Sequence, residues 1–361
     1  MVIFGSPSRY VQGPGALAAI GRELARIGGR AVLLIDPVML DRHGEAIAAA
    51  CTAEGVEALL LAFGGDCTDD EVARLAGLVA RAPDIVGAVG GGKCIDAGKA
   101  LADRYGARVV TVPSIASTDA PTSHNYVMYD DAHRMLEVRK LPRNPELVLV
   151  DTAVIAAAPK ALFLAGIGDA VGKIHEVRCC AGAGGRNIFG GRSAWTAVAL
   201  AEACHGAILD HGEAALAAID RQQPDQALER VVEATILMSG LAFESGGLSV
   251  AHSMTRGLTA LEPWSRQMHG MQVAYANVVQ MHAQGAEAED IDAFALFCRR
   301  IGLPVSLAEL GGRDATGQEI ASIAAKTMTA PHIRHLPRPV DEGELCRSIR
   351  WVEERYAGAT T

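Results

Sequence analysis

Three consecutive glycines between an apolar run and a helical pattern are the feature that most limits how this chain can fold. Residues 84–86 are followed by glycines at 90–92 and then by apolar residues at helical spacing from 95 to 102. This order predicts a strand, a tight turn and a helix. Because glycine carries no side chain, a pyrophosphate can approach the backbone amides and the positive end of the helix.

The glycine turn departs from two known phosphate-binding motifs. The P-loop pattern fits from Gly87 to Lys93, but it requires Ser or Thr where Cys94 stands. The dinucleotide fingerprint requires a third glycine where Ile95 stands. The segment is therefore either a pyrophosphate site or a tight strand-to-helix connection that binds nothing.

Strand and helix patterns alternate over the first part of the chain. Helices are expected at residues 14–28 and after the glycine turn, and strands at 30–36, 59–63, 84–86, 108–112 and 146–150. A hairpin is expected from strands at 126–130 and 135–138 joined through 131–133. The pattern predicts a doubly wound, mostly parallel α/β sheet. Its ligands would bind beyond the carboxyl ends of the strands, where Asp36, the glycine turn and the polar segment 113–130 follow. The alternative interpretation of segment 113–130 is a solvated loop that lines no ligand site.

The pattern changes to consecutive helices past residue 157. Helical periodicity covers residues 160–180, 193–211, 225–245, 247–261, 268–284 and 289–301. We therefore predict two domains, an α/β domain at residues 1–157 and an all-α domain at residues 158–361.

Composition excludes some partners. The net charge is −9 and no basic stripe is present, which argues against nucleic acid and anionic membranes. Eight cysteines occur without a C-x-x-C motif, as in a reduced protein. No apolar run is long enough to span a membrane, and the N-terminus lacks the order of a signal peptide. A cytoplasmic protein is expected.

An acid and two histidines in the helical part are candidate metal ligands. Asp169 lies among apolar residues, where a carboxylate needs a cation, and its alternative partner is Lys173 one turn later. His252 and His269 lie on later helices, and each taken alone is more often a structural histidine. Together the three leave a fourth position open, as in catalytic zinc sites, and they also suit Fe²⁺. Spacing alone does not select these two from eleven histidines.

Six stretches together resemble the glycerol dehydrogenases of the iron-containing alcohol dehydrogenase superfamily, whose fold is dehydroquinate-synthase-like. They are GGGKCIDAGKALAD, VPSIASTDAPTS, NPELVLVDTAVIAAAP, GIGDAVGKIHE, SVAHSMTRGLTALE and MHGMQVA, in the family's order. The resemblance implies NAD in a cleft between the domains, one zinc ion per subunit on Asp169, His252 and His269, and a symmetric octamer. Two departures are Met271, where the family usually carries an acid, and Gly168, where alanine is common.

The resemblance also implies which residues bind the cofactor and the substrate. Asp36 would meet the adenine ribose, and its carboxylate would repel a 2′-phosphate and so favour NAD over NADP. Its alternative role is a helix N-cap before Pro37. Asp119 would contact the polyol. The remaining cofactor positions are Gly91, Gly92, Lys93, Asp96, Ser114, Ser117, Ser123, Asn125 and Tyr129.

The implied activity is oxidation of glycerol, or a related 1,2-diol, to the hydroxyketone. A divalent metal would lower the pKa of the alcohol, and the alkoxide would give hydride to NAD. The alternatives are a dehydroquinate-synthase-type lyase and a glycerol-phosphate dehydrogenase relative, which both need basic residues for phosphate, and a binding protein without turnover.

Overall fold

The computed structural model describes residues 1–130 and 134–358, so the expected hairpin turn at 131–133 lies outside the described residues. Two compact units are present. One comprises Gly5–Phe163 with Ala214–Gly240, and the other comprises Met1–Phe4, Leu164–Glu213 and Leu241–Thr361. The first unit thus includes a segment beyond residue 157, and the domain boundary proposed there stays a prediction.

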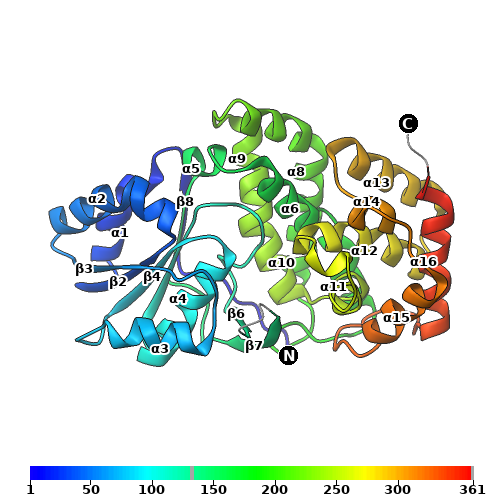
Figure 1. The fold of residues 1–361 in the computed structure, drawn as a ribbon, viewed down its shortest axis with the longest axis horizontal. Helices are drawn as coiled ribbons and strands as arrows, with labels where there is room; N and C mark the ends of the chain where they lie inside the picture. The colour runs from blue at the N-terminus through cyan, green and yellow to red at the C-terminus, as the bar shows by residue number, and fades with distance from the viewer. Residues whose placement is uncertain (131–133, 359–361) are drawn as a thin grey trace. The chain divides into compact units, whose positions relative to one another are not determined.

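A six-stranded parallel sheet forms the centre of the first unit (Figure 1). The strand order is β1-β8-β5-β4-β2-β3, and each neighbouring pair is parallel, which confirms the predicted sheet type. The strands are β1 (Tyr10–Gly13), β2 (Arg30–Ile35), β3 (Glu57–Ala62), β4 (Ile85–Gly90), β5 (Arg108–Pro113) and β8 (Leu147–Asp151). The sequence patterns do not predict β1, which is four residues long and only half-buried.

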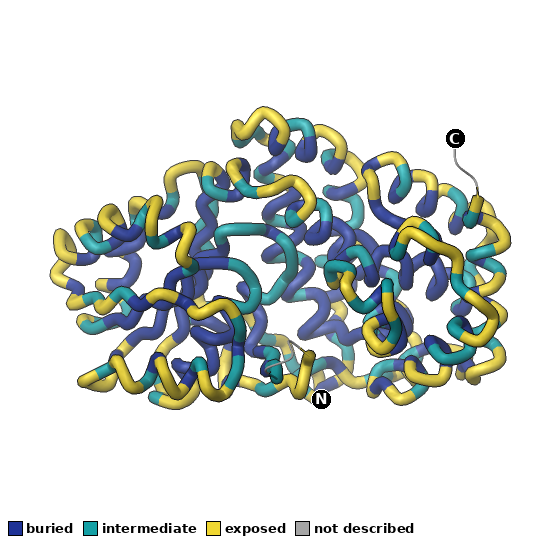
Figure 2. The backbone as a smooth tube through the Cα atoms, in the orientation of Figure 1, coloured by how far each residue is buried: buried dark blue, intermediate teal, exposed yellow. Residues whose placement is uncertain are grey.

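Alternate side chains of the sheet pack on helices on both of its faces. Leu33 and Ile35 of β2 share a core with α1 (Ile20–Ala25) and α2 (Pro37–Ala53). Their neighbour Leu34 shares the opposite core with α3 (Asp69–Gly77) and α4 (Gly92–Tyr105). Figure 2 shows the central strands buried and the outer turns of these helices exposed. The predicted helix at 14–28 is a short 3₁₀ turn, Ala16–Ala19, followed by α1.

The predicted hairpin forms a separate antiparallel pair in the same unit. It consists of β6 (Asn125–Tyr129) and β7 (Met135–Lys140), with an irregularity in register between Met128 and Tyr129. It lies against α4, on the side of the sheet that carries α3.

Helices make up nearly all of the later chain, as predicted. They are α5 (Thr152–Ala156), α6 (Lys160–Val171), α7 (Lys173–Gly182), α8 (Trp195–Asp220), α9 (Gln226–Glu233), α10 (Ser239–Gly246), α11 (Val250–Leu258), α12 (His269–Ala283), α13 (Ala288–Ile301), α14 (Leu307–Gly311), α15 (Gly317–Thr327) and α16 (Glu342–Tyr356). The expected helix at 160–180 is interrupted at Gly172. The one expected at 225–245 contains a π-helical turn, Ala234–Met238. The sequence patterns do not predict α14, α15 and α16.

Two expectations about location can be compared with the fold. Among the described residues no single helix is long and apolar enough to cross a membrane, although the bent pair Gln226–Gly246 and Val250–Leu258 meets the requirement when taken together. All eight cysteines are free, and seven of them are buried.

Glu353 gives the helical unit a specific dependence of stability on pH. Its carboxylate accepts from Leu307 N at 3.0 and 3.1 Å and from the Tyr275 hydroxyl at 2.9 Å. Burial raises the pKa of Glu353 to about 7, although these donors oppose the rise. The folded state therefore holds this proton more tightly than the unfolded chain, and stability falls as the pH rises from about 4.5 to about 7.

We predict that Glu353→Gln removes this loss. The amide keeps an oxygen acceptor but does not ionise. The free energy of unfolding of the variant, relative to that of the unaltered protein, should therefore be about 1–3 kcal/mol higher at pH 8 than at pH 5. Denaturant unfolding at the two pH values measures the difference. The exposed neighbour Glu354→Gln is the matched control, and an equal pH dependence in both variants would contradict the prediction.

Candidate metal and nucleotide sites

The helical unit brings the three predicted metal ligands together. Asp169 of α6, His252 of α11 and His269 at the start of α12 each offer an atom, and these atoms all lie within 4.8 Å of one another. Asp169 Oδ1 lies 3.3 Å from His252 Nε2 and 3.8 Å from His269 Nε2. Asp169 is buried, whereas the His269 side chain is 44% exposed, so the cluster opens on the His269 side.

Two glycines explain why Asp169 and His269 meet. A Cβ atom on Gly270 would lie 1.7 Å from the carbonyl oxygen of Ala165, and one on Gly168 would lie 2.5 Å from the carbonyl oxygen of Gly270. Helices α6 and α12 therefore touch backbone to backbone, which places the residues that follow Gly168 and precede Gly270 side by side. The departure at Gly168 noted in the sequence thus has a steric reason in this chain.

Two further charged residues of α7 complete the cluster, and both are fully buried. Lys173 Nζ lies 3.3 Å from Asp169 Oδ1 and 3.5 Å from His252 Nε2, so the ion pair weighed as an alternative role for Asp169 is present. Glu176 accepts from His252 Nδ1 and from the backbone amides of Ser249 and His252 at 2.9 and 3.0 Å. Glu176 is not among the residues predicted from the sequence. The positions 169, 173 and 176 repeat at helical spacing in an apolar segment, and that pattern is the signal that would have found it.

The buried charges shift one another's pKa values. Although burial alone disfavours its charged form, the carboxylates of Glu176 and Asp169 raise the pKa of His252 to about 9. Burial likewise opposes ionisation of Glu176, but His252 and Lys173 lower its pKa to about 2. Lys173 and both histidines hold the pKa of Asp169 below its ordinary value against the effect of burial. Both carboxylates are thus ionised at neutral pH.

The donor set fits a divalent transition metal. Ligand atoms that each lie about 2.0–2.2 Å from a tetrahedral zinc ion lie about 3.3 Å from one another, close to the separations from Asp169 Oδ1 to the two imidazoles. The bond from His252 Nδ1 to Glu176 leaves Nε2 facing Asp169, as carboxylate partners do for histidine ligands of metals. The assignment of Asp169, His252 and His269 as metal ligands itself stays a prediction.

The glycine turn and Asp36 lie together in the first unit, at the point where the strand order reverses. β2 is flanked by β3 on one side and β4 on the other, so the carboxyl ends of β2 and β4 form a topological switch point, where open α/β sheets bind their ligands. A Cβ atom on Gly90 would lie 3.0 Å from Asp36 Cβ. Asp36 also caps α2, since Oδ1 accepts from Val38 N at 3.0 Å.

The cofactor residues predicted from α4 have different surroundings. Gly91 and Gly92 open the helix. Lys93 pairs with Asp66 at 3.0 Å and lies over the Tyr129 ring, 4.8 Å from its centre. Asp96 is buried beneath the hairpin, and burial raises its pKa to about 7 despite the nearby Lys99.

The polar segment between β5 and β6 is held in place from two sides. Ser114 N donates to Gly90 O at 3.0 Å, so the segment begins against the glycine turn, and Ser117 follows at a half-buried position. The buried Lys99 ammonium donates to the carbonyls of Ala120 and Asn125, each at 2.7 Å. Lys99 is not among the residues predicted from the sequence.

Two polar side-chain atoms at the end of this segment are candidates for contact with a bound cofactor. Ser123 Oγ lies 3.5 Å from the Lys99 ammonium, and Asn125 Oδ1 is buried without a hydrogen-bond partner among the described residues. An unpaired buried acceptor of this kind fits a donor on a bound cofactor.

Asp119 is fixed by the segment that leads into α10. Its Oδ2 accepts from the buried Ser239 hydroxyl at 2.9 Å, and Thr122 Oγ1 donates to Ile236 O in the π-helical turn at 3.1 Å. Gly240 lies close enough to Thr122 that a Cβ atom there would sit 1.8 Å from Thr122 Oγ1. These contacts hold the predicted substrate residue on a packed element rather than on a free loop.

Comparison with known proteins shows what the chain is related to. Residues 7–152 match the family model for iron-containing alcohol dehydrogenase. A glycerol dehydrogenase of Thermotoga maritima is 37% identical over 97% of this chain and 96% of its own length. The chain belongs to the iron-containing alcohol dehydrogenase family.

Solved structures of the same family share the fold. A probable glycerol dehydrogenase from Sinorhizobium meliloti 1021 superposes with a TM-score of 0.91 at 34% identity, covering 98% of this chain and 99% of that one. Glycerol dehydrogenase from Schizosaccharomyces pombe gives a TM-score of 0.94 at 30% identity, covering 100% of this chain and 94% of that one. The predicted fold class of an iron-containing alcohol dehydrogenase is thereby confirmed.

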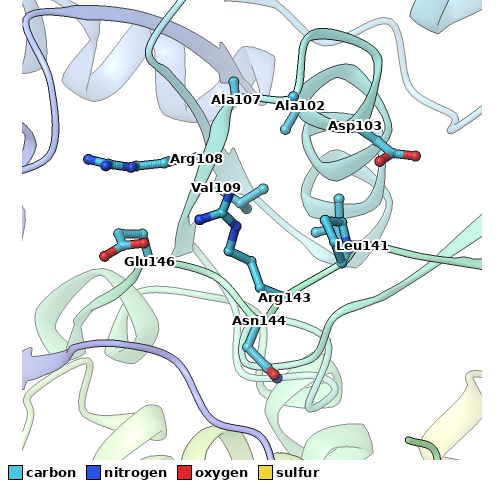
Figure 3. A pocket seen from close by; sticks show the side chains of 11 residues that line it. Ala102, Asp103, Ala107, Arg108, Val109, Leu141, Arg143, Asn144 and Glu146 are labelled. Carbon is cyan, nitrogen blue, oxygen red and sulfur yellow. The ribbon is translucent and has the colours of Figure 1, made fainter.

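The linings of two surface pockets include none of the predicted cofactor, metal or substrate residues. The pocket in Figure 3 is lined by Arg108, Arg143, Glu146 and neighbouring residues, at the amino ends of β5 and β8. That is the edge of the sheet opposite the glycine turn. Met271, the second departure from the family pattern, lines another pocket with Arg299 and Leu303 instead of joining the three-ligand cluster.

We predict that Asp169→Asn destabilises the metal-free protein by about 3–5 kcal/mol, because it leaves the buried Lys173 charge without its carboxylate. The double variant Asp169→Asn/Lys173→Met should recover most of that loss, since it removes both charges together. Denaturant unfolding after treatment with a chelator measures both free energies. A double variant as unstable as the single one would show that the ion pair does not carry the effect.

Proposed function

We propose that this protein oxidises glycerol, or a closely related 1,2-diol, to the hydroxyketone, with NAD as the hydride acceptor and a divalent metal on Asp169, His252 and His269. The observation that carries the proposal is the convergence of these three side chains. It occurs in a chain that is 37% identical, over nearly its whole length, to a protein named glycerol dehydrogenase.

The helical unit would bind the metal, and the first unit would bind the cofactor and the polyol. A divalent metal, when bound, supplies a Lewis acid that makes an alcohol easier to deprotonate. Glu176 holds the His252 imidazole in the orientation that presents Nε2, and the contact of Gly168 with Gly270 holds Asp169 against His269. In the first unit the glycine turn exposes backbone amides for a pyrophosphate, and Asp119 accepts a hydrogen bond from a hydroxyl group of the polyol.

Asp36 supports NAD rather than NADP. One carboxylate oxygen caps α2, and the other has no partner among the described residues, so it is available to a ribose hydroxyl. A negative charge at this edge of the sheet would repel a 2′-phosphate.

The finer assignments are part of the same proposal. We assign zinc, because catalytic zinc sites have three protein ligands and an open fourth position, and Fe²⁺ shares these ligand types. Metal analysis of protein purified without added metal distinguishes the two. The free cysteines support a reducing, cytoplasmic location. The symmetric octamer stays a prediction, to be measured by light scattering.

We predict that Asp169→Ala and His269→Ala each lose bound metal and lose turnover of glycerol, because each removes one of three protein ligands. Metal content and the appearance of reduced nicotinamide are the measurements. The exposed Asp210→Ala, on α8, is the control and should keep both. Normal glycerol oxidation by either ligand variant would show the metal assignment to be wrong.

A substrate panel tests the class of reaction. Reduced nicotinamide should appear with glycerol and 1,2-propanediol. Phosphate release from a sugar-acid phosphate would instead support a dehydroquinate-synthase-type lyase, and activity confined to a glycerol phosphate would support the phosphate-dependent relative. An absence of turnover with all of them would support a binding protein.

We predict that Ser239→Ala raises the KM for glycerol about five- to tenfold and leaves the KM for NAD unchanged, because it removes one hydrogen bond that orients Asp119. Steady-state kinetics with each substrate varied separate the two constants. The double variant Asp119→Ala/Ser239→Ala should be no worse than Asp119→Ala alone. If the two effects add, Ser239 acts through something other than Asp119.

A further inference from the structure

Lys173 places its amino group inside the cluster of proposed metal ligands, where it forms an ion pair with Asp169. Its Nζ lies 3.3 Å from Asp169 Oδ1 and 3.5 Å from His252 Nε2, the atoms that two of the three ligands would give to a metal. The side chain is fully buried, and its ammonium lies 5.4 Å from the centre of the Phe243 ring. The ammonium is therefore held at the cluster, out of contact with water.

We propose that Lys173 weakens divalent-metal binding at this site by competing for Asp169 and by repelling the incoming ion. The proposal rests on the proposed function, since it takes Asp169, His252 and His269 as the ligands. Without a metal, Lys173 supplies the charge that Asp169 needs in order to stay buried and ionised. The metal-free site is then a folded, neutralised arrangement that exchanges its ion readily.

The charges of the cluster indicate the direction of this effect. Asp169 and Glu176 contribute two negative charges, and Lys173 already balances one of them. A divalent ion bound by Asp169 and His252 would share both of the atoms that the ammonium contacts, and like charges interact strongly in a buried site because little water screens them. Glu176 offsets part of this repulsion through its contact with His252 Nδ1. Replacing the ammonium with a neutral group of similar length should therefore favour the ion.

The test compares zinc binding by the full-length protein and by Lys173→Met, with a competing chelator as the reporter. We expect the dissociation constant for Zn²⁺ to fall at least tenfold in Lys173→Met. We also expect the metal-free variant to melt at a lower temperature than the metal-free parent, because Asp169 loses its counter-charge, and zinc to restore the loss. Lys326→Met, an exposed residue of α15 in the same unit, controls for the change in net charge.

The result that overturns the proposal is an unchanged or larger dissociation constant, which would mean that Lys173 is indifferent to the metal or helps to hold it. Lys173→Gln, which keeps a polar end at that position, provides the same comparison if Lys173→Met does not fold. Asp169→Ala separates this failure from failure of the proposed function. Zinc binding by Asp169→Ala as tight as that of the parent would discard the three-ligand site itself.

Discussion

Burial of carboxylates beside matched cations is the constraint on which the helical unit depends. Asp169 and Glu176 are both inaccessible to water, where an unpaired carboxylate is strongly disfavoured. Lys173 and His252 are the cations that face them. These four residues lie on α6, α7 and α11, so the polar cluster ties the three helices to one another.

The parallel sheet of the first unit also brings distant segments together. Its strand order reverses between β2 and β4, and this reversal places Asp36 beside the glycine turn. The polar segment that follows β5 then starts from the turn itself through Ser114 N. Three segments separated along the chain thus reach one edge of the sheet without any of them being long, because parallel strands all point their carboxyl ends the same way.

Much of this organisation is predictable from sequence, and the exceptions have physical causes. Unbroken apolar strands and helical periodicity gave the α/β and helical parts, because burial on both faces leaves a clear pattern. β1 is too short and too exposed for such a pattern. The break at Gly172 and the π-helical turn were missed because residues on both sides keep helical spacing.

The site was predictable only in part. Asp169, His252 and His269 were selected by resemblance, since three residues on separate helices leave no local spacing to recognise. Lys173 was recognised as a neighbour of Asp169 along the helix. Its second contact, with His252, depends on how α7 and α11 pack, and no sequence pattern records that. Glu176 contacts His252, and Ser239 contacts Asp119. Both contacts join segments that are distant along the chain, so no sequence pattern records them either.

The buried ammonium of Lys99 has a consequence for ligand binding. It joins the carbonyls of Ala120 and Asn125, so the backbone around Ser123 is ordered as soon as the unit folds. Loops that close over ligands usually lose conformational entropy at the moment of binding, and the affinity is reduced by that amount. Here the conformational entropy of the segment is already lost when the protein folds. A cofactor would meet a rigid surface, and its affinity would reflect mainly the contacts that it makes.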